Sequence, residues 1–270
     1  MKTKSLLDEG KLTEALAEVK QEVKAHPSDA QLRTLLFELL SLVGDGEGGK
    51  RQLDVIAHQD SSAALAIEIY QNVLKGEEKR RQVFHAEKEP DFLFEKPTYV
   101  QFHLDAMSSL RMGHVAQAKN FLEASEQQRP PLTGHADGQP FNEFLDADDR
   151  ISPFLEVIVQ DSYAWVPFEQ IKRIEISAPK YLRDLIWIQA DIEGVSGPVG
   201  PVFIPVLYVN SVNSGNDQVR LGRMTQWESP GADVTLGLGQ RVFLIDGQDR
   251  GMLEVLEVEF DSQPLPEGNE

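Results

Sequence analysis

The chain has 270 residues, of which 41% are hydrophobic and 26% are charged, so it can bury a sizeable core and is not expected to be disordered. Its 26 Lys and Arg residues face 44 Asp and Glu residues, and the net charge of −18 disfavours binding to nucleic acid or to an anionic membrane surface. The chain contains no cysteine, which excludes disulfides, thiolate metal sites and thiol nucleophiles.

The first residues, MKTKSLLDEG, do not read as a secretory signal, because the apolar run stops at Asp8 and Glu9. The longest apolar stretch, Leu35 to Val43, is interrupted by Glu38 and is too short to cross a bilayer. We therefore expect a cytoplasmic protein.

Residues 1–130 are predicted to form a helical domain. Pro27 ends a first helical segment, and Ser28 followed by Gln31 is expected to cap a second one. The apolar residues that recur at helical spacing in these two segments are Leu12, Ala15, Leu16, Val19 and Val23, then Leu32, Leu35, Leu36, Leu39, Leu40 and Val43.

A repeat is present in this helical part. Gly10 and Gly113 are each followed by an alanine five residues later and by a proline seventeen residues later, and Gly44 stands 34 residues after Gly10. A period near 34 is typical of the tetratricopeptide hairpin, in which glycine allows the turn and proline stops the second helix. The middle copy is less regular, because Gly49 replaces the alanine and Gly76 stands near the next expected turn. An unrelated helical bundle is the alternative.

Residues 140–260 are predicted to form a smaller β-rich domain, which makes the fold class α+β. Short β-branched runs separated by Pro, Gly, Asn and Asp predict strands over 155–159, 163–168, 171–176, 202–209, 242–245 and 253–258. Residues 129–139 contain breakers and are expected to join the domains, and residues 261–270 are expected to be a frayed tail. Residues 126–270 carry a net charge of −14.

The motifs of common enzymes are not assembled in this sequence, so we predict no catalytic residue, cofactor site or metal site. Gly44–Arg51 resembles a phosphate-binding loop but lacks its Ser or Thr and is expected to be a flexible turn. Gly237–Arg241 lacks a third glycine and is expected to be a β-turn. The six histidines show no metal-ligand spacing, and a Gly-x-Ser-x-Gly elbow is missing.

One cluster of residues could carry chemistry, the sequence Asp-Ala-Asp-Asp-Arg at 146–150. Asp146, Asp148 and Asp149 could bind a divalent cation in a metal-dependent hydrolase. The structural interpretation, which we favour, has Asp146 or Asp148 accepting backbone N–H groups and Arg150 contacting a carboxylate.

A second group of residues combines charges with large aromatic side chains. Arg183 and Asp184 are predicted to form a buried ion pair beside Trp187. Trp165, Trp187 and Trp227 all lie in the β-rich part and are expected to be core anchors, with an exposed contact for a partner protein as the alternative.

Taken in order, several short segments resemble the ImpE/TagJ family of bacterial type VI secretion accessory proteins, also called SciE. These segments are Gly10–Ala15, Arg33–Phe37, Gly44–Asp45, Glu78–Phe84, Asp146–Arg150, Pro153–Glu156, Tyr163–Phe168, Ala178–Pro179, Leu182–Asp184 with Trp187, Arg223–Trp227 and Gly239–Arg241. The chain departs from the family pattern after Asp45, where an aromatic and a basic residue are replaced by Gly46–Gly49.

The resemblance implies a non-enzymatic cytoplasmic adaptor that binds the N-terminal helix of the small contractile-sheath subunit and acts near the sheath-recycling AAA+ ATPase. The residues agree in kind, since stacked helical repeats often form a surface that holds a helix. An acidic second domain would also attract a basic segment. The metal-dependent hydrolase and a generic helical-repeat scaffold outside secretion are the alternatives.

Overall fold

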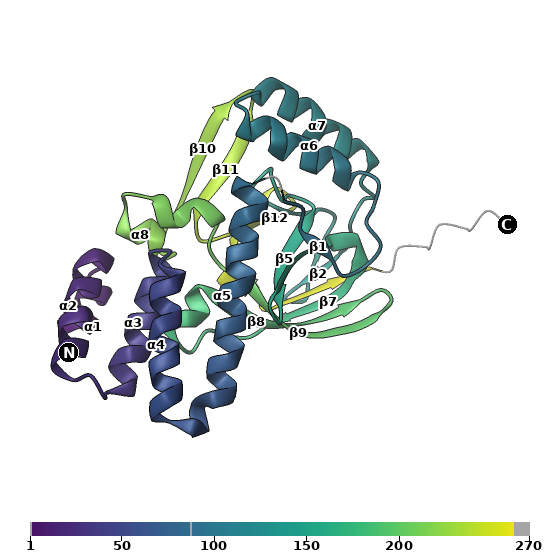
Figure 1. The fold of residues 1–270 in the computed structure, drawn as a ribbon. Helices are drawn as coiled ribbons and strands as arrows, with labels where there is room; N and C mark the ends of the chain where they lie inside the picture. Colours follow the sequence, from purple (N-terminus) through teal and green to yellow (C-terminus); the bar gives the residue numbers. More distant parts are fainter. Residues whose placement is uncertain (1, 87, 262–270) are drawn as a thin grey trace.

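The computed structural model describes residues 2–86 and 88–261. Its N-terminal part is helical and its C-terminal part is built on β-sheet, so the fold is α+β, as the sequence predicted (Figure 1). The helices are α1 (Lys2–Asp8), α2 (Leu12–Ala25), α3 (Ala30–Leu42), α4 (Gly46–Gln59), α5 (Ala64–His85), α6 (Val100–Arg111), α7 (Val115–Gln128) and the short α8 (Asp217–Arg220). None of the described helices has both the length and the apolar composition of a membrane span. The predicted tail lies outside the described residues, apart from Asp261.

Three glycines form the sharp turns of the predicted hairpins. Gly10 lies between α1 and α2, Gly44 between α3 and α4, and Gly113 between α6 and α7, with φ angles of 76°, 79° and 77°. These left-handed values strain any residue that has a Cβ atom. Pro27 follows α2 and Pro130 follows α7, so the predicted hairpin ends are confirmed.

Two predictions about helix starts were wrong. Asp29, not Ser28, caps α3, because its carboxylate accepts two backbone N–H groups of the first turn at 2.9 and 3.0 Å. The glycine-rich segment 44–51 is mostly helix instead of a flexible turn. Asp45 starts α4 there by accepting the N–H of Gly48 at 2.7 Å. In both cases an aspartate caps the helix, and in α4 the cap offsets the weak helix propensity of the glycines that follow it.

The main sheet has nine strands in the order β1-β6-β5-β9-β8-β7-β14-β2-β3 among the described residues. All registered pairs are antiparallel except β1 with β6. Its strands are β1 (Asp91–Phe92), β2 (Gly134–Ala136), β3 (Gln139–Phe141), β5 (Phe154–Val159), β6 (Ser162–Pro167), β7 (Ile171–Ile176), β8 (Trp187–Gly194), β9 (Gly197–Pro205) and β14 (Glu257–Phe260).

Two smaller sheets complete the β-rich part. One has the order β13-β12-β4, and the other is a ribbon of β10 and β11 that rises beside α7 (Figure 1). Their strands are β4 (Phe144–Asp146), β10 (Thr225–Gly231), β11 (Val234–Gly239), β12 (Val242–Ile245) and β13 (Gln248–Gly251).

The strand predictions were accurate where the strand is buried and apolar. β5, β6, β7 and β12 start and end within one residue of the predicted ranges. β8 was missed because its buried residues alternate with polar ones, and β14 begins at Glu257 because residues 252–254 form a 3₁₀ turn. The predicted β-turn at Gly237–Arg241 was also wrong, because Gly237 and Gly239 belong to β11.

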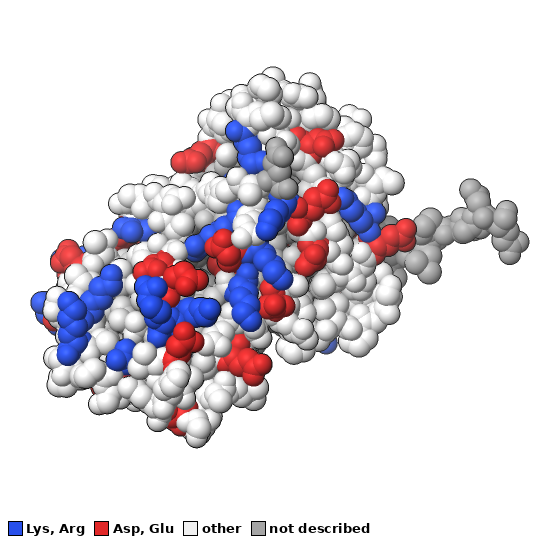
Figure 2. All heavy atoms as spheres, in the orientation of Figure 1, with Lys and Arg blue, Asp and Glu red and all other residues white. Residues whose placement is uncertain are grey.

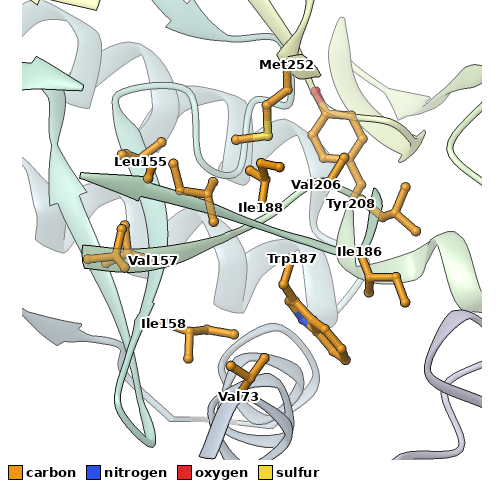
Figure 3. Close-up of a cluster of buried hydrophobic side chains, with 14 of the residues drawn as sticks. Val73, Leu155, Val157, Ile158, Ile186, Trp187, Ile188, Val206, Tyr208 and Met252 are labelled. Carbon is orange, nitrogen blue, oxygen red and sulfur yellow. The ribbon is translucent and has the colours of Figure 1, made fainter. Parts of the chain in front are cut away.

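Helix α5 lies against the main sheet and joins the two parts of the molecule. Figure 3 shows Val73 of α5 gathered with Ile158 of β5 and Trp187 of β8. Among the described residues, one hydrophobic cluster contains side chains of both parts, from Leu12 of α2 to Phe260 of β14. The division into residues 1–130 and 140–260 stays a prediction, since the apolar core is shared by both parts.

Gly76 is not a turn residue, as the repeat spacing suggested, but lies inside α5. A Cβ atom at this position would come within 2.4 Å of Cγ2 of Ile158. The missing side chain therefore lets α5 approach β5 closely.

We expect Gly76→Ala to destabilise the protein, although alanine normally favours a helix. The added methyl group must displace Ile158, and overpacking of this kind costs about 1–3 kcal/mol. Gly46→Ala is the matched control, because a Cβ atom there meets nothing within 4 Å. Urea unfolding should show a lower stability for the first variant only, and an increase for Gly76→Ala would contradict the close packing of α5.

His103 of α6 is buried between the α6–α7 hairpin and the sheet. Its Nδ1 lies 2.7 Å from Oγ of Ser125 on α7, and its ring meets that of Phe154 edge-on with centroids 5.1 Å apart. Burial disfavours the charged imidazolium and lowers the pKa of His103 to about 3.

We therefore expect His103 to contribute to acid unfolding. The unfolded chain protonates this ring near pH 6.5, so the stability that its neutral form supplies is present above that pH and is lost as the pH falls toward 3. The loss should be about 1.4 kcal/mol per pH unit. Urea titrations between pH 7 and 4 should show this slope in the wild type and in Ser125→Ala but not in His103→Leu. Equal slopes in the wild type and His103→Leu would rule this contribution out.

Candidate functional site

The segment 146–150 begins at the last residue of β4 and is held by its own carboxylates. Asp146 Oδ1 accepts the backbone N–H of Asp148 at 2.9 Å, and Asp148 Oδ1 accepts the backbone N–H of Arg150 at 2.9 Å. The guanidinium of Arg150 also binds both carboxylate oxygens of Asp148. These are the contacts expected for the structural interpretation of this segment.

Asp146 is also paired with Arg241, which directly precedes β12. Nε and Nη2 of Arg241 lie 2.9 and 2.7 Å from Asp146 Oδ2, and the hydroxyl of Tyr208 donates to Asp146 Oδ1 at 3.0 Å. Both charged side chains are fully buried. Burial raises the pKa of Asp146 to about 6, although Arg241 opposes the shift.

A second buried ion pair links helix α5 to the main sheet. Arg80 of α5 donates to both oxygens of Glu156 on β5 at 2.7 and 3.1 Å, and Arg241 Nη1 lies 3.1 Å from Glu156 Oε2. Burial alone would raise the pKa of Glu156, but Arg80 and Arg241 outweigh it and hold the pKa at about 2. Glu156 is therefore a buried carboxylate that stays ionised.

Sequence reasoning did not select Arg80, Glu156 or Arg241 as individual site residues. A signal was available for Glu156, because it is a carboxylate inside an apolar strand, where a charge needs a partner. The partners could not be chosen, since Arg80 is 76 residues away from Glu156 in sequence and Arg241 is 95 residues away from Asp146.

Trp165 and Trp187 are core residues with exposures of 0% and 1%. The indole N–H of Trp165 donates to the hydroxyl of Tyr163 at 2.6 Å, and that hydroxyl donates to Glu156 at 2.5 Å. The indole N–H of Trp187 donates to Glu77 of α5 at 3.1 Å. Both indoles therefore extend the buried network.

The predicted ion pair between Arg183 and Asp184 is absent from the described residues. Arg183 instead contacts Glu38 of α3 at 3.0 Å and the hydroxyl of Tyr70 of α5 at 2.8 Å. Asp184 accepts two backbone N–H groups of residues 180 and 181 at 2.7 and 2.8 Å. The two side chains have different partners because residues 182–185 form a 3₁₀ turn.

Every carboxylate proposed for metal chemistry is used inside the protein. Asp146 and Asp148 bind Arg241 and Arg150, and Asp149 Oδ2 accepts the N–H of Thr235 at 2.7 Å. Within the described ranges, no group of three or more His, Asp or Glu side chains could hold a metal ion. Through these contacts the segment 146–150 links the buried ion pairs to strand β11.

The accessible surface offers features suited to protein recognition. A cleft of about 750 Å³ lies along α4 and α5, with Leu74 and Trp187 among its lining residues and charges of both signs around it. Figure 2 shows Lys and Arg side chains interspersed with Asp and Glu over this face. Leu65 and Ile69 of α5 are exposed by 71% and 38%. Trp227 of β10 is exposed by 41%, so the prediction that it is a core anchor was wrong, because it lies on a two-stranded ribbon outside the main sheet.

The comparisons with known proteins give a family, a relative in sequence and a solved structure with the same fold. The family described as ImpE protein matches residues 138–259. The type VI secretion system accessory component TagJ of Pseudomonas aeruginosa is 33% identical over 261 residues, which cover 97% of this chain and 92% of TagJ. A crystal structure of a protein from Vibrio parahaemolyticus superposes with a TM-score of 0.90 at 23% identity, over 97% of this chain and 98% of that one.

The elements define an α+β protein with a helical-repeat N-terminal part. Its buried charges are paired with one another. The level of identity to TagJ over nearly the whole length places it further: the chain belongs to the ImpE/TagJ family. The sequence resemblance is thereby confirmed.

We expect Arg150→Ala to lower stability, because it leaves the buried carboxylate of Asp148 without its cation. Breaking a buried pair in this way costs about 3–5 kcal/mol. Lys172→Ala is the control and should change stability little, since its pair with Glu193 is about half exposed on both sides, at 54% and 44%. Thermal unfolding of both variants measures the difference, and equal melting temperatures for Arg150→Ala and the wild type would exclude a structural role of this pair.

Proposed function

We propose that this protein is a non-enzymatic accessory component of a bacterial type VI secretion apparatus and works in the cytoplasm. The observation that carries this proposal is the 33% identity to the accessory component TagJ over 97% of the chain. The engagement of the candidate catalytic carboxylates by arginines and backbone amides supports the non-enzymatic part.

The proposed partner is the N-terminal helix of the small subunit of the contractile sheath. Leu65 and Ile69 support a helix-binding role, because they lie one turn apart on α5 and leave apolar surface in water. An amphipathic helix could cover both side chains and reach the charged cleft beside α5. The net charge of −14 over residues 126–270 favours faster association with a basic helix at low salt.

The proposed place of action is near the AAA+ ATPase that recycles the sheath, with no nucleotide bound by this chain. A metal-dependent hydrolase is less well supported, since using Asp146, Asp148 and Asp149 as ligands would strip Arg241, Arg150 and the Thr235 N–H of their partners. A scaffold outside secretion is less well supported because of the relationship with TagJ.

The test is a calorimetric titration of the purified protein with the small sheath subunit and with a version that lacks its N-terminal helix. We expect binding of modest affinity to the complete subunit only, without added nucleotide. Equal affinity for both forms would remove the helix as the ligand.

The α5 surface is tested in the same titration with Leu65→Glu. A charge at this exposed position should weaken binding about tenfold, since it opposes apolar contact without entering the core. Met112→Glu is the matched control, because Met112 is 60% exposed just after α6. Unchanged affinity in Leu65→Glu would exclude this face of α5.

A further inference from the structure

Strand β10 forms an open edge of β-structure. It pairs with β11 alone among the described residues, and its far end reaches α7 (Figure 1). Residues 226–231 of β10 are all exposed, whereas β11 is largely buried. The outer edge of β10 is therefore free to contact another chain.

The direction of the free backbone groups follows from the contacts of β11. Trp227 is opposite Gly237, and the N–H of Gly237 donates at 2.8 Å to Asp148, away from β10. Thr225 is opposite Gly239, whose N–H donates at 2.7 Å to Ser211. In an antiparallel ladder, paired residues that do not bond each other both direct their N–H and C=O groups outward. Thr225 and Trp227 thus present their backbone groups at the open edge.

The side chain of Trp227 lies at this edge in a fixed place. Its ring packs against Tyr208 with centroids 5.9 Å apart, yet 41% of the residue remains exposed. A groove of about 490 Å³ begins at Thr225, and its lining includes Leu185, Met224 and Leu253. An extended chain paired with β10 would have Trp227 beside it and this groove at its end.

The charge of the β10–β11 ribbon favours a partner segment with basic side chains. Residues 225–239 contain Glu228 and Asp233 but no Lys or Arg. The lining of the groove at Thr225 adds one charge of each sign, Arg223 and Glu254. A basic side chain on the added strand would be attracted by these carboxylates and could lie over the face of the indole. A second copy of this protein is disfavoured as the occupant, because each chain carries a net charge of −18.

We propose that the edge of β10 from Thr225 to Glu228 binds an extended, basic segment of a partner protein by strand addition, with Trp227 as its anchor. Pairing stops there because the register shifts between Glu228 and Gly231 and Pro230 has no N–H. The site is short, so it is suited to a weak contact that adds to another one. It is separate from the proposed helix-binding face of α5.

The probe is the dye-labelled octapeptide Ac-VKVRVKVR-NH₂, titrated with the full chain by fluorescence anisotropy, beside a twin in which Glu replaces every Lys and Arg. We expect the basic peptide to bind at least about tenfold more tightly at low salt. Binding should also shield Trp227 from acrylamide quenching, a signal specific to this site because Trp165 and Trp187 are buried.

Two variants separate the indole from the backbone. Trp227→Ala removes the anchor and should weaken peptide binding about fivefold. Trp227→Pro also removes the outward N–H without taking a bond from the ladder, so it should fold and bind more weakly still. Val195→Ala changes an exposed apolar residue elsewhere, 50% exposed, and should bind as the wild type does.

Binding of both peptides with equal affinity, binding of neither, or unchanged binding in Trp227→Ala and Trp227→Pro would overturn the proposal. Sedimentation velocity tests the other occupant, since a wild-type dimer that Trp227→Ala dissociates would assign the edge to a second copy. Trp227→Ala should keep its affinity for the sheath subunit, so failure here and failure of the proposed function are distinguishable.

Discussion

The buried carboxylate of Glu156 is the constraint on which the arrangement of the molecule depends. It lies in the middle of an apolar strand with 0% exposure, where an unpaired charge would be strongly unfavourable. Arg80 reaches it from α5 and Arg241 from the start of β12, so one carboxylate joins the helical part, the main sheet and the small sheet. Arg241 then carries the network to Asp146 and the segment that holds β11. Removing one member of such a buried pair is strongly destabilising, because it leaves an uncompensated charge inside the protein.

The first helical hairpin is fastened to the far end of the chain by a different kind of contact. The backbone N–H of Thr13 on α2 donates to Asp217 of α8 at 3.0 Å, and Arg223 donates to the carbonyl of Asp8 at 3.1 Å. These contacts are largely exposed and add less than the buried pairs. The helical part is thus attached through the buried contacts of α5, through His103 of α6 and, more weakly, through α8, which gives its outer surface a defined position relative to the β10–β11 ribbon.

The pairing of the buried charges also bears on function. The carboxylates that the sequence suggested for metal chemistry are bound by arginines and backbone amides inside the protein, whereas the face of α5 and the edge of β10 are accessible. Two such surfaces differ in kind: the exposed face of α5 offers apolar side chains at helical spacing, and the edge of β10 offers backbone groups beside an indole. We propose both surfaces as binding sites, one for a helix and one for an extended strand, so that two segments of other chains could be held at once.

The sequence alone determined the helical hairpins, because the turn at Gly10, Gly44 and Gly113 is a local property of glycine and the stop at Pro27 is a local property of proline. It also determined strands β5, β6, β7 and β12, whose apolar runs need no knowledge of their neighbours. Tertiary structure alone decided the partners of Glu156, the close approach of α5 to β5 at Gly76, and the exposure of Trp227 beside the burial of Trp165. The physical reason is that pairing and burial depend on which residues meet across long sequence separations, and periodicity within a segment contains no information about that.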